Sequence, residues 1–282
     1  MPRIAALLLA GAIGFHITCA FAEEVVSFDS AQYLVGELQQ RLARERGEVI
    51  KRAPPDTIKG YLSRPPGQGP FPAVVHLHGC GGLSEQRRIT DAEQFVRWGY
   101  VTLVVDSFTT RGIADACGSG ALPPRHADAI GALIYLSTLP FVDAKRIAVV
   151  GYSQGGMAAL QIASLQPAAI FDVPAGLRFK TAVAYYPDCS AATNRLAMPT
   201  LVLIGELDDW SWAASCERLM KRWDHNSAPL KLIVFPEAYH SFDSTALRGT
   251  VRYFGHWLRY DPEATRRAAE AAHDFLAAQL GD

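Results

Sequence analysis

A serine set among glycines is the feature of this sequence with the clearest chemical potential. Ser153 lies at the centre of Gly-Tyr-Ser-Gln-Gly, residues 151–155, and a further glycine follows at position 156. The preceding residues have the apolar pattern of a buried strand, and helical periodicity begins at Met157. In a strand–turn–helix, G-x-S-x-G exposes a serine hydroxyl at a sheet edge because the glycines allow a sharp turn. The pattern predicts a nucleophilic serine, with an incidental serine in a glycine-rich turn as the alternative.

A serine hydroxyl is a weak nucleophile, so a base must take its proton. His240 is the predicted base because it lies in a loop directly after a strand expected at 231–235. At the carboxyl end of that strand, the imidazole can reach the sheet edge that presents Ser153. The remaining downstream histidines fall in or beside expected helices and fit this role less well: His225, His256 and His273.

The acid that orients the base is expected after the preceding strand, at 200–204. Residues 205–210 read Gly-Glu-Leu-Asp-Asp-Trp, and we predict Asp208, with Asp209 as the alternative. The other member of the pair would then be a helix N-cap or a surface charge. Asp188, after a strand expected at 181–185, is a more distant candidate. The order Ser, Asp, His along the chain is that of the α/β-hydrolase triad.

Backbone amides that could stabilise an oxyanion are expected at two places. One is Gln154, the residue after the serine, and the other is Cys80 in the glycine-rich loop His-Gly-Cys-Gly-Gly, residues 78–82. His76 and His78 point the same way along the strand before this loop, which could suggest a metal pair. No third ligand is spaced to join them, so we interpret both as structural and predict no metal.

Side chains beside these motifs are candidates for a substrate pocket. The aromatic candidates, each with core packing as the alternative, are Tyr152, Phe108, Trp210 and Tyr239. Arg111 follows a strand expected at 100–105 and could bind a substrate carboxylate. It could equally be the partner in an ion pair outside the pocket.

The elements that must position these residues alternate between strand and helix. Strands are expected at 57–63, 73–77, 100–105, 147–150, 181–185, 200–204 and 231–235. Helices are expected at 31–44, 85–98, 126–137, 157–165, 213–223 and from Pro262, after an Asp261 cap, to Gly281. This alternation predicts an α/β fold with a mostly parallel central sheet and helices on both faces.

Length, composition and charge limit the class of protein to which the chain can belong. The 282 residues are 49% hydrophobic with a formal net charge of −1, which fits one large globular domain and argues against nucleic-acid binding.

The first residues predict a signal peptide over 1–22, because Arg3 is followed by an apolar run at 4–15 and by Ala-Phe-Ala at 20–22. A membrane-anchor helix is disfavoured because the apolar run is too short to span a bilayer comfortably. Lipidation at Cys19 is disfavoured because threonine, here Thr18, is a poor fit at the position before a lipidated cysteine. We expect an exported chain without a stable membrane anchor, with an N-terminal segment at 23–56 and the main domain at 57–282.

Four cysteines remain after the predicted cleavage, which permits two disulfides in an oxidising compartment. All four follow strands and so lie near the carboxyl edge of the sheet. Sequence order and proximity favour Cys80–Cys117 and Cys189–Cys216 over the crossed pairings. Four free thiols are the alternative.

From about Thr57 to its C-terminus the chain resembles the dienelactone hydrolase family of α/β hydrolases. The most specific segments are Val-Asp-Ala-Lys-Arg-Ile at 142–147 leading into the serine motif, Gly-Glu-Leu-Asp at 205–208, and Tyr-His-Ser-Phe at 239–242. The resemblance implies a compact enzyme without a large cap domain and without a cofactor.

Two departures from the family pattern bear on the substrate. Founding members use cysteine as nucleophile, held by a glutamate in the loop that matches 78–82, whereas this chain has Ser153 and no glutamate there. They also bind a substrate carboxylate through an arginine four residues after the histidine, where this chain has Ser244. The first difference makes the chain more similar to an ordinary esterase, and the second argues against dienelactone itself as the substrate.

The sequence therefore predicts a secreted serine hydrolase, periplasmic or extracellular, that cleaves small carboxylic esters or lactones through an acyl-enzyme. Two alternatives stay open. One is a peptidase of the prolyl-oligopeptidase type, which shares the triad order but usually carries a larger substrate domain. The other is a catalytically silent α/β-hydrolase that serves as a binding module.

Overall fold

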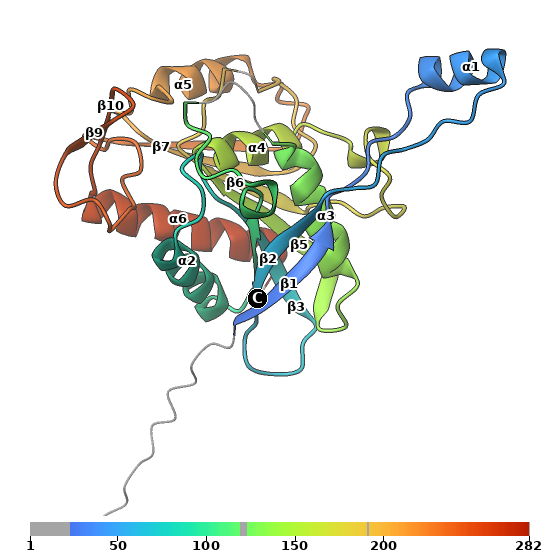
Figure 1. Ribbon diagram of the computed structural model, residues 1–282. Coiled ribbons are helices and arrows are strands. Elements are labelled where there is room, and N and C mark those ends of the chain that lie inside the picture. The colour runs from blue at the N-terminus through green and yellow to red at the C-terminus, as the bar shows by residue number, and fades with distance from the viewer. Residues whose placement is uncertain (1–22, 119–122, 191, 282) are drawn as a thin grey trace, which may run out of the picture.

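The computed structural model describes residues 23–118, 123–190 and 192–281 (Figure 1). The predicted signal peptide at 1–22 lies outside the described residues. Within the described ranges, no helix is both long enough and apolar enough to cross a bilayer.

A single mixed sheet forms the centre of the molecule. Its strands are β1 Glu23–Asp29, β2 Thr57–Ser63, β3 Phe71–Leu77, β4 Val101–Asp106, β5 Val142–Tyr152, β6 Thr181–Tyr185, β7 Thr200–Gly205 and β8 Leu230–Phe235. They are arranged in the order β1-β2-β4-β3-β5-β6-β7-β8. β2 is antiparallel to both neighbours, and every pairing from β4 to β8 is parallel. The predicted mostly parallel sheet is confirmed, and its central strands read as continuous apolar runs because both faces are covered.

Helices cover the two faces of this sheet. They are α2 Glu85–Arg97, α3 Arg125–Ser137, α4 Gln154–Ile162, α5 Ala213–Arg222 and α6 Pro262–Leu280. Adjacent strand residues point to opposite faces, and on β5 Tyr152 packs under Arg87 of α2 while Gly151 lies against the start of α4. α2 and α4 therefore lie on opposite faces (Figure 1). The Asp261 side chain caps α6 as predicted, accepting from the Ala264 amide at 2.9 Å.

The N-terminal segment differs from the prediction of one helix at 31–44. It begins as strand β1, pairs with β2 at the sheet edge, and only then forms helix α1, Glu37–Arg46. β1 was missed because it buries little: in Glu-Glu-Val-Val-Ser-Phe-Asp only Val26 and Phe28 turn inward. A second element was also missed, the hairpin of β9, Val251–Tyr253, and β10, His256–Leu258.

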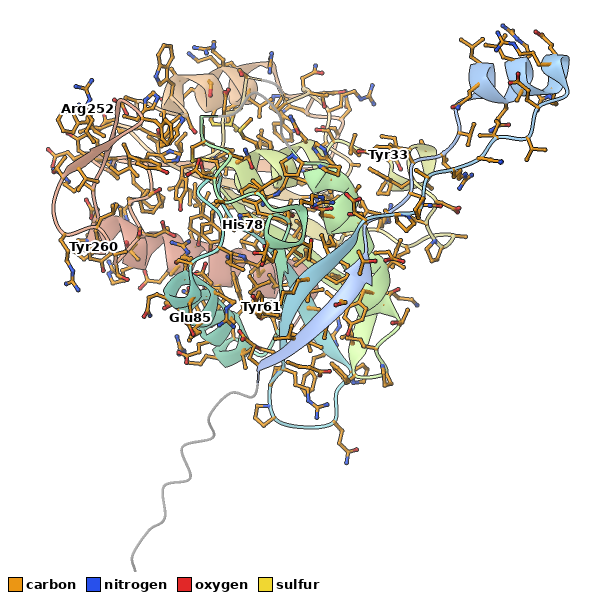
Figure 2. The ribbon with its side chains drawn as sticks, viewed as in Figure 1. Tyr33, Tyr61, His78, Glu85, Arg252 and Tyr260 are labelled. Carbon is orange, nitrogen blue, oxygen red and sulfur yellow. A yellow bond between two sulfur atoms is a disulfide. The ribbon has the colours of Figure 1, made fainter. Side chains whose placement is uncertain are left out.

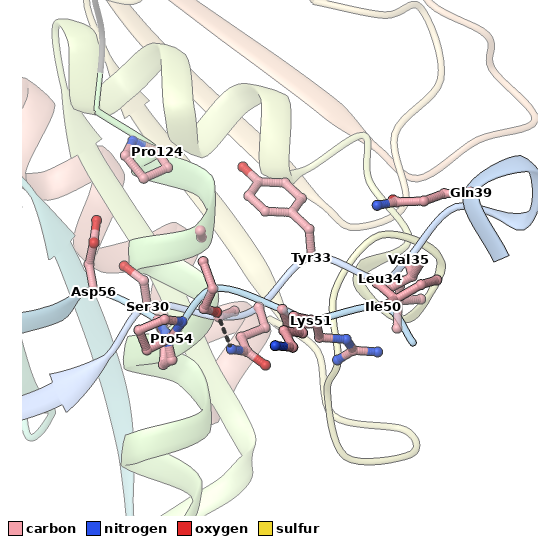
Figure 3. A pocket seen from close by; sticks show the side chains of 16 residues that line it. Ser30, Tyr33, Leu34, Val35, Gln39, Ile50, Lys51, Pro54, Asp56 and Pro124 are labelled. Carbon is pink, nitrogen blue, oxygen red and sulfur yellow. Dashed lines mark hydrogen bonds between the residues drawn. The ribbon is translucent and has the colours of Figure 1, made fainter. Parts of the chain in front are cut away.

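Helix α1 projects from the body of the molecule on two extended segments (Figure 1). At the base of this arm lies a cavity of about 420 Å³, with Tyr33 and Asp56 among its lining residues (Figure 3). The Gln32 side chain donates to the Ala53 carbonyl at 3.1 Å and so joins the two segments. None of the residues predicted to do chemistry lines this cavity.

Both predicted disulfides are present. Cys80 is bonded to Cys117 and Cys189 to Cys216, over 37 and 27 residues of sequence. The first joins the loops after β3 and β4, and the second joins the loop after β6 to α5. Each bridge therefore fastens loops at the carboxyl edge of the sheet.

Removing the Cys189–Cys216 bridge should lower the free energy of unfolding by about 3–4 kcal/mol, because closing a loop of this size restricts the unfolded chain. Cys189→Ala with Cys216→Ala, compared with the wild type in urea unfolding without reductant, measures the loss. Reductant should lower the wild type below the double variant, because it also opens the Cys80–Cys117 bridge that the double variant keeps. An unchanged unfolding midpoint in the double variant would contradict the expectation.

Candidate active site

Ser153 occupies a backbone conformation that few residues adopt. Its φ and ψ are 53° and −116°, which places a non-glycine residue at positive φ between β5 and α4. An added Cβ at Gly151 would lie 2.0 Å from the Gly155 carbonyl oxygen, and one at Gly155 would lie 2.2 Å from that of Leu77. The glycines are required because main chain packs directly against main chain around the serine.

His240 lies between Ser153 and Asp208. Its Nε2 is 2.9 Å from Ser153 Oγ, and its Nδ1 is 2.8 Å from Asp208 Oδ2. The other carboxylate oxygen, Asp208 Oδ1, accepts from the Trp210 and Ser211 amides at 3.0 and 2.8 Å. His240 and Asp208 are buried, while Ser153 is partly exposed. The arrangement can move a proton from a serine hydroxyl to an imidazole whose tautomer is fixed by a carboxylate.

Asp209, the alternative acid, has a different role in the structure. Its Oδ1 accepts from the Trp257 amide at 3.0 Å, and it contacts His256 rather than His240. Asp188 caps its own turn by accepting from the Ser190 amide at 2.9 Å. Neither of these two carboxylates has a hydrogen bond to the candidate base.

The loop after β3 lies against the serine. An added Cβ on Gly79 would be 3.5 Å from Ser153 Cβ. Gln154 is the first residue of α4, where a helix leaves its amides without intrahelical acceptors. Within the described ranges, no hydrogen bond uses the Cys80 amide, while the Cys80 carbonyl accepts from Ala116 at 2.9 Å. The two predicted donors therefore lie on segments that meet at the serine.

A buried arginine that the sequence did not reveal supports both segments. Arg125, at the start of α3, donates to the His78 carbonyl at 2.5 Å and to the Gln154 side-chain oxygen at 3.4 Å. Burial lowers the pKa of Arg125 to about 10, so the guanidinium stays charged at neutral pH. No local signal marks this residue, because its role depends on contacts between three distant segments.

The predicted aromatic pocket residues divide between the interior and the site. Phe108, 2% exposed, packs edge-on against His78, and Tyr152 stacks on Tyr185 at 4.5 Å, so both belong to the interior. Trp210 is the one beside the base, with its ring 5.1 Å from that of His240. Tyr239 packs under Arg259 at 4.8 Å.

Arg111 does not extend toward the serine as a carboxylate-binding residue would. Its Nη1 contacts Asp128 and its Nε contacts Asp56, each at 2.8 Å, and it also donates to the Ser107 carbonyl. Its Nη2 donates to Ser30 and to the second oxygen of Asp128, so all five N–H groups have partners, as the ion-pair alternative expects. His76 is likewise structural, with Nε2 2.7 Å from Asp91.

A polar network on the α2 side of the sheet also escaped prediction. Arg87 contacts Asp91 at 2.6 Å and Asp243 at 2.7 Å, and Asp243 accepts from the Tyr186 hydroxyl at 2.8 Å. The Tyr186 ring lies 4.7 Å from that of His240. Burial raises the pKa of Tyr186, which keeps its hydroxyl protonated as the donor to Asp243, and its ring packs at 61° to that of His240.

Comparison with known proteins agrees with this geometry. Residues 58–280 match the dienelactone hydrolase family. The chain belongs to this family. Among curated proteins, the quorum-quenching protein AidA of Acinetobacter baumannii (strain MDR-ZJ06) is 33% identical over 100 residues, or 34% of this chain. That match spans 32% of AidA, about a third of its length.

Solved structures of this family and of related hydrolases share the fold. A dienelactone hydrolase-like promiscuous phosphotriesterase from metagenomic libraries is 19% identical with a TM-score of 0.63, covering 92% of this chain and 100% of its own. Esterase 2 of Thermogutta terrifontis, phosphorylated by paraoxon, is 18% identical with a TM-score of 0.60, covering 90% and 96%. At these identities the likeness establishes the α/β-hydrolase fold.

Gly155→Ala should destabilise the protein by about 3 kcal/mol or more, because the new methyl would collide with the Leu77 and His78 carbonyls. Gly36→Ala is the matched control, since nothing lies within 4 Å of its added Cβ. It should change stability by less than about 0.5 kcal/mol. Thermal unfolding of both variants measures the contrast, and equal shifts would show that the elbow tolerates a side chain.

Proposed function

We propose that this protein is a serine hydrolase of carboxylic esters or lactones, with Ser153, His240 and Asp208 as its catalytic residues. The observation that carries the proposal is the continuous line of hydrogen bonds from Asp208 through His240 to the serine hydroxyl. Family membership supports a hydrolase acting on a small molecule. The esterase name of the Thermogutta protein supports the ester class only through a shared fold.

The first half of the reaction is acylation. His240 Nε2 takes the proton of Ser153 Oγ as the oxygen attacks the substrate carbonyl, and Asp208 stabilises the imidazolium that forms. The Cys80 and Gln154 amides donate to the tetrahedral oxyanion, each contributing about 3 kcal/mol in comparable sites. His240 then gives its proton to the alcohol oxygen as the carbon–oxygen bond breaks.

The second half is hydrolysis of the acyl-enzyme. His240 removes a proton from water, the resulting hydroxide attacks the acyl carbonyl, and Ser153 leaves with the proton returned by the imidazole. A lactone follows the same steps, but its alcohol stays attached to the acyl group until water releases the hydroxy acid. The proposed steps use no cofactor.

We also propose that the protein is exported. The signal-peptide pattern at 1–22 is one support, and two disulfides, which form in oxidising compartments, are the other. Cleavage after Ala22 would leave a chain that starts with β1.

The two other readings make different predictions for simple assays. A peptidase would cleave peptide p-nitroanilides better than esters of the same acyl group. A silent binding module would leave both uncleaved and would not react with a serine-directed probe. An assay of p-nitrophenyl esters, small lactones and peptide anilides side by side separates the three.

A fluorophosphonate should label the wild type at Ser153, because the strained turn and His240 activate that hydroxyl. Ser153→Ala should fold normally and lose both labelling and ester hydrolysis. Mass spectrometry of the labelled peptide identifies the site, and circular dichroism of the variant is the control for folding. Labelling at another serine would falsify the assignment of the nucleophile.

Asp208→Asn should reduce kcat by several orders of magnitude, about 10⁴-fold by analogy with serine proteases, since the amide favours the wrong imidazole tautomer. Asp209→Asn should reduce it much less, because Asp209 contacts the hairpin instead of His240. Steady-state kinetics on one ester compares the two variants. If Asp209→Asn has the larger effect, the acid is misassigned.

A further inference from the structure

The hairpin of β9 and β10 has two chemically distinct faces. It lies between His240 and α6 in sequence, and its cross-strand pairs are Tyr253 with His256, Arg252 with Trp257, and Val251 with Leu258. Successive strand residues alternate between faces. Tyr253 and His256 therefore share one face, and Arg252 and Trp257 share the other.

The Tyr253 face packs against the acid and base loops. Trp210 stacks on His256 with ring centroids 4.8 Å apart and lies 5.9 Å from Tyr253. The same Trp210 ring is 5.1 Å from His240. Leu258 of β10 also forms a bridge with the His240 backbone. This side of the hairpin is thus fixed to the candidate base.

The tip of the hairpin contacts the opposite side of the active site. The Tyr253 hydroxyl donates to Asp115 at 2.6 Å, and an added Cβ on Gly118 would lie 2.8 Å from the Phe254 ring. These two contacts flank Cys117, which is bonded to Cys80 of the oxyanion loop. Contacts therefore run around Ser153 from its base, through the hairpin, to its oxyanion loop.

Asp115 supplies a carboxylate to these contacts, with Oδ1 accepting from the Cys117 amide at 2.7 Å and Oδ2 accepting from the Tyr253 hydroxyl. Arg252 lies on the outer face, 5.3 Å from the Trp257 ring, and Figure 2 shows it at the periphery of the molecule. Arg87 and Arg111 are held by carboxylates elsewhere.

We propose that Trp210, Tyr253 and Phe254 form an aromatic collar that binds the alcohol part of the substrate and selects uncharged, aromatic or other apolar alcohols. The inference rests on the proposed ester hydrolysis. His240 must deliver its proton to the leaving oxygen, so the alcohol lies beside the imidazole and therefore beside Trp210. Aromatic walls favour an apolar alcohol, and the Asp115 carboxylate repels one that carries a carboxylate.

Acetate esters test the collar because they all form the same acetyl-enzyme, so kcat/KM reports binding and acylation alone. The ratio of variant to wild type on one ester cancels the intrinsic leaving-group reactivity of its alcohol and leaves the effect of recognition. Phe254→Ala should lower kcat/KM for phenyl acetate about tenfold more than for trifluoroethyl acetate. Trp257→Ala, on the outer face of the same hairpin, should leave this ratio within about twofold. An equal loss on both esters in Phe254→Ala, or a matching loss in Trp257→Ala, would overturn the collar.

The charge argument has its own test. Wild type should prefer phenyl acetate over 4-acetoxybenzoate, and Asp115→Asn should narrow that preference about fivefold while keeping an oxygen that can accept from Tyr253. An unchanged preference overturns the role of Asp115. If the wild type hydrolyses neither ester and resists fluorophosphonate, the proposed function fails and the collar with it. If the wild type hydrolyses phenyl acetate and 4-acetoxybenzoate with equal kcat/KM, the collar is overturned while the proposed ester hydrolysis stands.

Discussion

Main chain packs directly against main chain at Ser153, and the rest of the active site depends on that contact. The serine amide donates to the Tyr185 carbonyl at 2.9 Å, and the serine carbonyl accepts from Met157 at 2.8 Å, so the strained residue is held on both sides. Such strain costs about 1–3 kcal/mol and persists only where the surroundings fix it. Gly155 lets α4 approach the end of β3, which brings the oxyanion loop next to the nucleophile. The same contact positions the hydroxyl and the first amide of α4.

The features that could be predicted from the sequence are those with a local pattern. The serine elbow, the loop histidine and the acid each follow an apolar strand, and parallel strands bring their carboxyl ends to one edge. That geometry also explains why the two disulfide pairings could be anticipated from order along the chain. The alternation of strands and helices predicted the fold class, because buried parallel strands are continuously apolar and can be recognised in the sequence. The choice of Asp208 over Asp209 depended on a register of one residue, which the local sequence leaves open.

The features that could not be predicted depend on contacts between distant segments. Arg87 and Asp243 are 156 residues apart in sequence, and the residues flanking each of them contain no pattern that predicts the ion pair. Arg125 is the first residue of an otherwise largely apolar helix, and its partners, the His78 carbonyl and the Gln154 side chain, come from distant segments. Arg111 is a different case: its position after a strand was compatible with substrate binding or with an ion pair, and in the fold Asp128 on α3 and Asp56 before β2 accept from it. Electrostatic pairing inside a fold is set by three-dimensional proximity.

The proposed catalytic and alcohol-binding parts of the site meet at the bridge between Cys80, in the loop after β3, and Cys117, in the loop after β4. In the proposed reaction Cys80 presents an amide to the oxyanion, and an oxyanion donor works only if it is already in place when charge develops. The bridge to Cys117 holds that amide, yet the residues on either side of Cys117 are the ones that the hairpin touches through Tyr253 and Phe254. A substrate that displaced the hairpin would therefore also strain the oxyanion loop. Recognition of the alcohol and stabilisation of the transition state are coupled through one covalent link, and an alcohol that fits poorly would be turned over slowly as well as bound weakly.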